Sequence, residues 1–214
     1  MRIETLTVPG VNAILLDEVK DHMRIDGTDE DASLGALVGT ATSLVEGYLD
    51  LALIDRQVAL YLDAWPTTSG KKANEPWWNG VADGAISTLD SSCYHVPLMI
   101  KPVHIISGID ITTADGSTVA WGTDNYYLKP GMAPALVRKY GRSWPVPGVR
   151  ADGIKITATA GFGADWNTVP ASIRQALLML VAHLYYNRGN EAGGNAFLAS
   201  GAAPLLASFR DMRI

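Results

Sequence analysis

The sequence has little cysteine and little charge, and it contains no long apolar run. Cys93 is the one cysteine among 214 residues, which excludes an internal disulfide and fits a reducing compartment. Charged residues make up 18% of the chain, below the roughly 25% of average soluble proteins. The longest apolar run, residues 176–182, is too short to cross a bilayer. Together with an N-terminus that lacks a signal pattern, these features argue against a secreted miniprotein and a membrane protein.

The charge that is present is unevenly distributed. Residues 1–55 hold 3 Lys or Arg and 11 Asp or Glu, a net charge of −8, whereas residues 56–165 carry +1 and residues 166–214 carry +2. The total of −5 argues against a protein that coats nucleic acid. An acidic first part and a mildly basic remainder can attract each other, either within one fold or between copies.

Helical periodicity marks the first part of the chain. Leu16, Val19 and Met23 recur at the spacing of a short amphipathic helix. Thr28 is a favourable N-cap for a second helix, since three carboxylates follow it in the first turn. An apolar stripe over residues 34–49 continues that helix for about five turns.

The last part of the chain is also helical. Pro170 suits the start of a helix and Gly189 suits the position after its end. This helix is apolar nearly all round, which predicts burial in a core or between subunits, with His183 as a hydrogen-bonded core residue. Residues 190–195 are typical of a flexible joint, and a short apolar segment follows.

The middle of the chain has the pattern of strands, because apolar and polar residues alternate and turn residues separate the runs. Asp115-Gly116 predicts a hairpin, and residues 66–92 form a long excursion. The alternating runs are residues 57–62, 96–100, 105–113, 126–128, 135–140 and 154–160. The predicted fold class is α+β: a helical bundle of residues 1–56 and 166–214, with a C-terminal arm of about 190–214, carries a β-rich antiparallel insert of residues 57–165 that contains a hairpin.

A search for catalytic or metal-binding patterns finds none. The acidic stretch that begins at Asp26 differs from a calcium loop, because its sixth position is Asp31 and its twelfth is Leu37. The four histidines are not spaced like a metal pair on a helix, and Cys93 is best explained as a buried, inert thiol. We therefore expect no catalytic residue, no metal and no cofactor, and a protein that is not an enzyme.

One basic stretch is interleaved with aromatic residues. Arg138, Lys139 and Arg142 alternate with Tyr140 and end at Trp144. Such a stretch can contact phosphates while an aromatic ring stacks on a base. It is also the pattern of a strand end and hairpin turn with solvated cations, which the negative total charge favours. Both interpretations stay open at this point.

The order of several segments resembles the phage head–tail connector (adaptor) family of long-tailed phages and related gene transfer agents. Each segment alone is weak, but the ordered set spans nearly the whole chain. The segments are 16–26 (LDEVKDHMRID), 29–31 (DED), 45–49 (VEGYL), 101–103 (KPV), 140–145 (YGRSWP), 159–163 (TAGFG), 169–170 (VP), 186–188 (YNR), 205–206 (LL) and 209–210 (FR).

The resemblance implies a structural role in head completion. Members of this family form a ring, twelvefold in the expected case, beneath the portal protein of a virion or gene-transfer particle. The ring extends the DNA conduit without sequence-specific DNA binding and meets a stopper or tail-terminator protein. The C-terminal segment then docks on the portal and becomes ordered on assembly, with Leu205, Leu206, Phe209, Arg210 and Met212 as the expected contacts.

Other roles remain alternatives. The apolar residues of the C-terminal segment could instead cap the protein's own bundle. Arg138, Lys139, Arg142 and Trp144 are candidate contacts to a neighbouring subunit or to the DNA conduit. A tail terminator or stopper is the second functional hypothesis. An enzyme with an aromatic-lined β surface, suggested by the six tryptophans, is a distant third.

Overall fold

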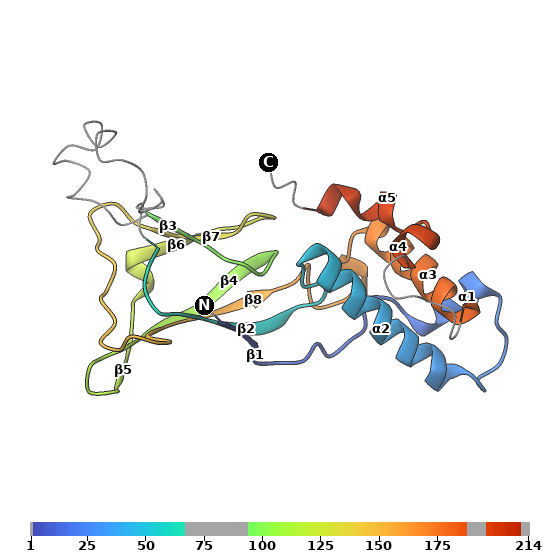
Figure 1. The fold of residues 1–214 in the computed structure, drawn as a ribbon, viewed down its shortest axis with the longest axis horizontal. Coiled ribbons are helices and arrows are strands. Elements are labelled where there is room, and N and C mark those ends of the chain that lie inside the picture. The colour runs from blue at the N-terminus through green and yellow to red at the C-terminus, as the bar shows by residue number, and fades with distance from the viewer. Residues whose placement is uncertain (1, 67–93, 188–195, 211–214) are drawn as a thin grey trace, which may run out of the picture. The chain divides into compact units, whose positions relative to one another are not determined.

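The structure, a computed structural model, describes residues 2–66, 94–187 and 196–210. It consists of two units, and each contains several segments of the chain. The β unit comprises residues 1–6, 57–99 and 103–159, and the helical unit comprises residues 7–56, 100–102 and 160–214. The chain therefore passes between the units five times, after Leu6, Arg56, Met99, Pro102 and Thr159. Helices and antiparallel strand pairs are both present, which confirms the predicted α+β class (Figure 1).

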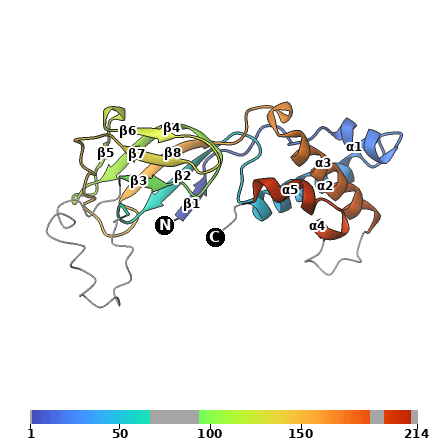
Figure 2. The ribbon, with the colours of Figure 1, turned by 90° about the horizontal axis from the view of Figure 1, so that it is seen from above.

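The β unit is built from two sheets (Figure 2). The five-stranded sheet has the order β1 (Arg2–Thr5), β2 (Arg56–Leu62), β8 (Ile154–Ala160), β4 (Val103–Thr112) and β5 (Thr118–Ala120). The three-stranded sheet has the order β3 (His95–Pro97), β7 (Ala135–Arg138) and β6 (Tyr126–Lys129), and both of its pairs are antiparallel. Every alternating run of the sequence contributes a strand, and β8 alternates buried and half-buried residues along its length.

Strand β1 is a difference from the sequence-based expectation, which placed all of residues 1–56 in the bundle. It pairs antiparallel with β2, and Arg2 lies opposite Tyr61, with its guanidinium carbon 4.2 Å from the ring centroid. All four residues of β1 are exposed, so the strand has no alternation of apolar and polar positions. The strand forms because it pairs with β2, and this pairing cannot be predicted from the local sequence of β1.

The predicted hairpin joins β4 to β5. Gly116 has a φ of +83°, and the Thr113 N–H donates to the Ser117 carbonyl at 2.9 Å. The Asp115 carboxylate accepts hydrogen bonds from the hydroxyls of Thr113 and Ser117, which lowers its pKa to about 2. The turn is therefore stabilised by its own side chains.

The helical unit is arranged around α3 (Ala171–Tyr186). α3 contacts α1 (Leu16–Met23), α2 (Asp31–Leu49), α4 (Ala196–Ala199) and α5 (Ala203–Leu206). Its buried side chains are Ile173, Ala176, Leu177, Leu180 and Val181. An apolar helix that is covered by four others is what its sequence predicted. Within the described ranges, no helix is both long and apolar enough to cross a membrane.

The start of α2 differs from the prediction that Thr28 caps it. The helix begins at Asp31, with Glu30 in the N-cap position and no side-chain cap. The Thr28 carbonyl instead accepts the Asp31 N–H at 3.2 Å, and the Lys20 ammonium pairs with the Asp31 carboxylate. Lys20 also donates to the Gly27 carbonyl at 2.9 Å, so a lysine of α1 holds the turn in place of a capping hydroxyl.

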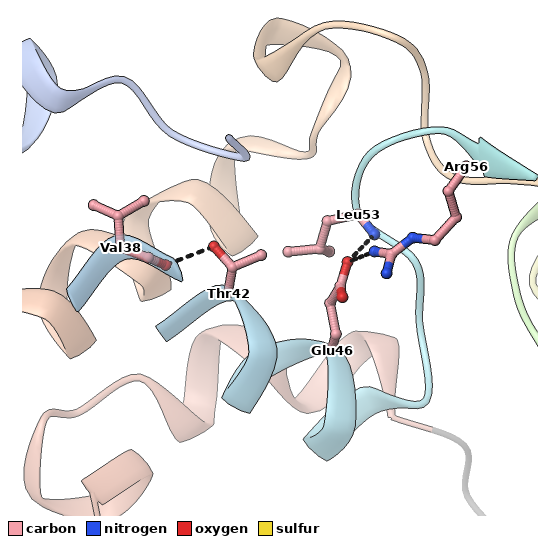
Figure 3. A network of polar contacts seen from close by, with 5 residues as sticks. All are labelled: Val38, Thr42, Glu46, Leu53 and Arg56. Carbon is pink, nitrogen blue, oxygen red and sulfur yellow. Dashed lines mark hydrogen bonds and ion pairs between the residues drawn. The ribbon is translucent and has the colours of Figure 1, made fainter. Parts of the chain in front are cut away.

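The segment that leaves α2 is fixed by one carboxylate (Figure 3). Glu46 Oε1 accepts the Leu53 N–H at 2.9 Å and also pairs with the Arg56 guanidinium. Both charged side chains are largely buried, with exposed fractions of 17% for Glu46 and 16% for Arg56. Phe162 donates its N–H to the Leu53 carbonyl, so the segment after β8 runs beside this one. Gly161, with a φ of +150°, is required there, since a Cβ would lie 2.5 Å from the Asp55 nitrogen.

We predict that Glu46→Ala lowers the free energy of unfolding by about 2–3 kcal/mol, because it leaves the Arg56 guanidinium buried without its partner. Glu4→Ala is the matched control: Glu4 pairs with Arg2 at 3.5 Å on an exposed strand, and its loss should cost less than about 1 kcal/mol. Urea denaturation of the two variants measures the difference. Equal stability of the two variants would contradict the role given to Glu46.

Candidate assembly surfaces

The basic stretch of the sequence lies on a tight turn that follows β7. The Arg142 N–H donates to the Lys139 carbonyl at 3.2 Å, and Gly141 has a φ of +74°. A positive φ at the third position of a turn favours glycine. This geometry places Tyr140 at the tip, where its side chain is fully exposed.

The turn is held by several hydrogen bonds to its own unit. Arg138 Nη1 donates to the Arg142 carbonyl at 2.6 Å, and its backbone N–H donates to the Tyr94 carbonyl at 2.9 Å. The Lys139 N–H donates to the Asn125 carbonyl at 2.9 Å, and its ammonium donates to the Thr123 carbonyl at 3.3 Å. The backbone that carries the three cations is therefore preorganised.

These residues line an open depression of about 860 Å³, which we call the basic tyrosine surface. Three cations and three tyrosines surround it, and no carboxylate lies among the lining residues. The lining residues are Tyr94, Tyr127, Val137, Arg138, Lys139, Tyr140, Gly141, Arg142 and Ser143. Tyrosine and arginine are enriched in protein interfaces, so the composition suits recognition of an acidic partner.

Trp144, the fourth candidate contact of this stretch, packs inward beside Arg138, whose guanidinium carbon lies 5.9 Å from the centroid of its ring. It is 9% exposed and stacks on Trp65 with ring centroids 4.2 Å apart. Trp121 packs against both rings, and Trp65 Nε1 donates to the Pro145 carbonyl at 2.7 Å. Burial raises the pKa of Tyr126, which stacks on Trp121. Trp144 thus belongs to an aromatic core beside the turn, while Trp77 and Trp78 lie outside the described residues.

The C-terminal candidates lie on the helical unit. Leu206 is completely buried in the core of this unit, and Leu205 and Phe209 are half-buried against the same core. Phe209 meets Phe162 edge to face, with centroids 6.5 Å apart. Arg210 is exposed, and its Nη1 donates to the Tyr48 hydroxyl at 3.4 Å. Met212 lies outside the described residues.

Residues 196–210 therefore lie against α3 of the same chain. The sequence led us to expect that residues 190–214 become ordered only on assembly, and that expectation stays a prediction. In this position α4 and α5 cover part of the apolar surface of α3. For Leu206 the structure shows the alternative role, a cap on the protein's own bundle. Docking of the segment on a portal stays a prediction, and the joint at residues 190–195 lies outside the described residues.

In the described part of the chain, neither the potential metal ligands nor the histidines form a further candidate binding site. Among the described residues, no group of three or more His, Cys, Asp or Glu could hold a metal ion. His183 is half-buried, and its Nδ1 lies 3.1 Å from the side-chain nitrogen of Asn187. This contact is in line with the predicted hydrogen-bonded role. Cys93 lies outside the described residues.

We predict that Leu206→Ala lowers the free energy of unfolding by about 2–5 kcal/mol, because it opens a cavity in a filled core. Leu198→Ala is the matched control in the same segment, since Leu198 is 70% exposed and its loss should cost less than about 0.5 kcal/mol. Thermal and urea unfolding of both variants measure this. Similar stabilities would show that α5 does not support the bundle.

Comparison with known proteins gives one family and a set of structures. Residues 13–74 match the family model described as phage gp6-like head-tail connector protein. No curated protein sequence matches the chain.

Three solved structures are similar over the whole chain. One is from the neck of an empty gene transfer agent particle with C6 symmetry (25% identity, TM-score 0.77), one from the virion of a native gene transfer agent particle (27%, 0.74), and one from the neck of a native particle with C12 symmetry (25%, 0.73). Each match covers 100% of this chain and 97% of the other. The resemblance predicted from the sequence is therefore confirmed: residues 13–74 match the phage gp6-like head-tail connector family, and the whole chain shares the fold of a neck protein of gene transfer agent particles.

Proposed function

We propose that the chain is a head–tail adaptor: it forms a ring beneath the portal, extends the DNA conduit and connects the capsid to a stopper or tail. The observation that supports this most strongly is the likeness over the full chain to a protein in the neck of a gene transfer agent particle. A match that covers 100% of one chain and 97% of the other leaves no unit of either protein unmatched. Both units thus belong to the same type of particle component.

A ring is supported by the symmetry of the similar structures. C6 and C12 symmetry describe necks that contain repeated copies around an axis. In a closed ring each subunit offers two different patches to its two neighbours. The low charge of this chain, 18%, suits a subunit with much of its surface in contact. Twelve copies is the number that we propose.

The proposed role is structural and not enzymatic. The matched family and the similar structures are parts of virus-like particles. A net charge of −5 lets DNA pass with little electrostatic attraction to the ring as a whole. We therefore place DNA in the conduit as a passing polymer and not as a sequence-specific ligand.

The proposed contact with the portal is the C-terminal segment. Leu206 anchors this segment in the core of the bundle. Leu205, Phe209 and Arg210 retain exposed surface. Arg210 projects from the end of the described segment and lies over the Tyr48 ring at 5.2 Å. Met212 lies two residues further along the sequence. A segment seated on its own bundle still offers this outer edge to a portal.

We predict that the protein forms a twelve-copy ring in direct contact with the portal of the particle that contains it. Electron microscopy of purified particles, with the chain located by an added small tag, measures its position. A ring one level further from the capsid would identify a stopper or tail terminator instead. Absence of the chain from the neck would overturn the proposal.

We predict that Arg210→Glu weakens binding to purified portal at least about tenfold, which corresponds to the loss of one interface hot spot. Its effect on the free energy of unfolding should stay below about 1 kcal/mol, because Tyr48 is the one described residue that the Arg210 side chain is seen to contact, and this contact is exposed. Arg150→Glu, an exposed change of equal charge in the β unit, is the control. Unchanged portal binding by the Arg210 variant would contradict docking through this segment.

A further inference from the structure

We propose that the basic tyrosine surface of one copy binds the acidic α1–α2 corner of a neighbouring copy. The acidic corner is defined as residues 17–31. The inference rests on the proposed function, because a ring is what brings two copies together. It names the two patches that meet.

The basic tyrosine surface is ready to accept a negatively charged partner. Neither Lys139 nor Arg142 forms an ion pair with any described carboxylate, and the Arg142 side chain is exposed. Tyr94 and Tyr127 are 64% and 52% exposed, and Tyr140 is fully exposed at the tip of the turn. Exposed aromatic rings beside unpaired cations are costly to leave in water and favourable to bury against a partner.

The acidic corner supplies the opposite charge. Residues 17–31 contain seven Asp or Glu and two Lys or Arg, a net charge of −5, which equals that of the whole chain. Two of the carboxylates are paired: Asp31 with Lys20, and Glu18 with Arg174 at 3.5 Å. The exposed carboxylates that form no ion pair with a described residue are those of Asp17, Asp21, Asp26 and Asp29.

The two patches differ from each other, which fits a ring and not a twofold dimer. Each copy carries one basic and one acidic patch, so contact between neighbours is head to tail. Such contacts repeat around an axis until the ring closes. Because every copy carries both patches, the acidic corner and the basic tyrosine surface are always present at equal concentration. Electrostatic complementarity then selects the correct face and speeds encounter.

DNA is the competing occupant of the basic tyrosine surface. Three cations on a chain of net charge −5 are few for a phosphate-binding face, and the tyrosines lie at exposed positions that proteins use for contact. A conduit that held DNA by arginines around its whole ring would also oppose DNA passage. The observations therefore favour a protein partner, and the test below separates the two.

The contact is tested first by carbodiimide crosslinking of the purified full-length chain, at the highest concentration that stays in solution. Equal amounts of unlabelled and ¹⁵N-labelled chain are mixed, so that mass spectrometry distinguishes links between copies from links within one. We expect mixed-isotope links from Lys139 to Asp26 or Asp29, with a yield that falls steeply between about 0.05 M and about 0.5 M salt. Absence of mixed links at Lys139 overturns the proposal.

Charge reversal then tests whether the same contact drives association. Lys139→Glu with Arg142→Glu should weaken self-association in sedimentation velocity at least about tenfold, and Asp26→Lys with Asp29→Lys should do the same. A chain with all four changes should regain association, since the patches become complementary again with their signs exchanged. Lys129→Glu with Arg150→Glu, two exposed changes of equal charge on the β unit, should have no effect. Failure of the fourfold variant to regain association overturns the proposal.

Two further measurements show whether a negative result contradicts this inference or the proposed function. Binding to purified portal tests the proposed function alone, because it does not depend on the basic tyrosine surface. If the unmodified chain binds portal but gives no mixed-isotope links at Lys139, only this inference fails. Fluorescence anisotropy with labelled double-stranded DNA tests the other occupant. If the Lys139→Glu, Arg142→Glu chain loses DNA binding but associates normally, the surface belongs to DNA and the proposal is wrong.

Discussion

The constraint on which the helical unit depends is the apolar surface of α3. A helix that is apolar over most of its surface is unfavourable in water, so other elements must cover most of it. α1 and α2 come from the start of the chain, and α4 and α5 come from its end. Because all of them meet on α3, the two ends of the sequence form one bundle, while most of the intervening segment forms the separate β unit. Burial of a single helix thus determines the domain organisation.

The two units present different chemistry for assembly. The helical unit carries the acidic corner and the C-terminal segment, whose half-buried Phe209 and exposed Arg210 lie beside a fully packed Leu206. The β unit carries the basic tyrosine surface on a turn stabilised by Arg138 and by the neighbouring tryptophan core. Rigid support behind an exposed edge is what an assembly protein needs, because ordering an interface on binding costs affinity.

Much of this architecture could be predicted from the sequence, and the exceptions have physical causes. The start of α3, the strand β8 and the Asp115-Gly116 hairpin follow from local signals: a proline, an alternation and a turn dipeptide. Strand β1, the lysine-held start of α2 and the packing of Leu206 depend on partners distant in the chain. Arg138, Lys139 and Arg142 line one surface, whereas Trp144 packs inward beside Arg138, a direction that the local sequence does not determine.

The five passages of the chain between the units have a consequence for how such a protein can change in evolution. Each unit consists of three separate segments, so no single exchange of continuous coding sequence can replace one unit and keep the other. The two sets of surfaces are therefore inherited together. A change of partner on one unit has to arise by substitutions within it, or by insertions in loops that lie wholly inside it, and not by recombination of a ready-made module.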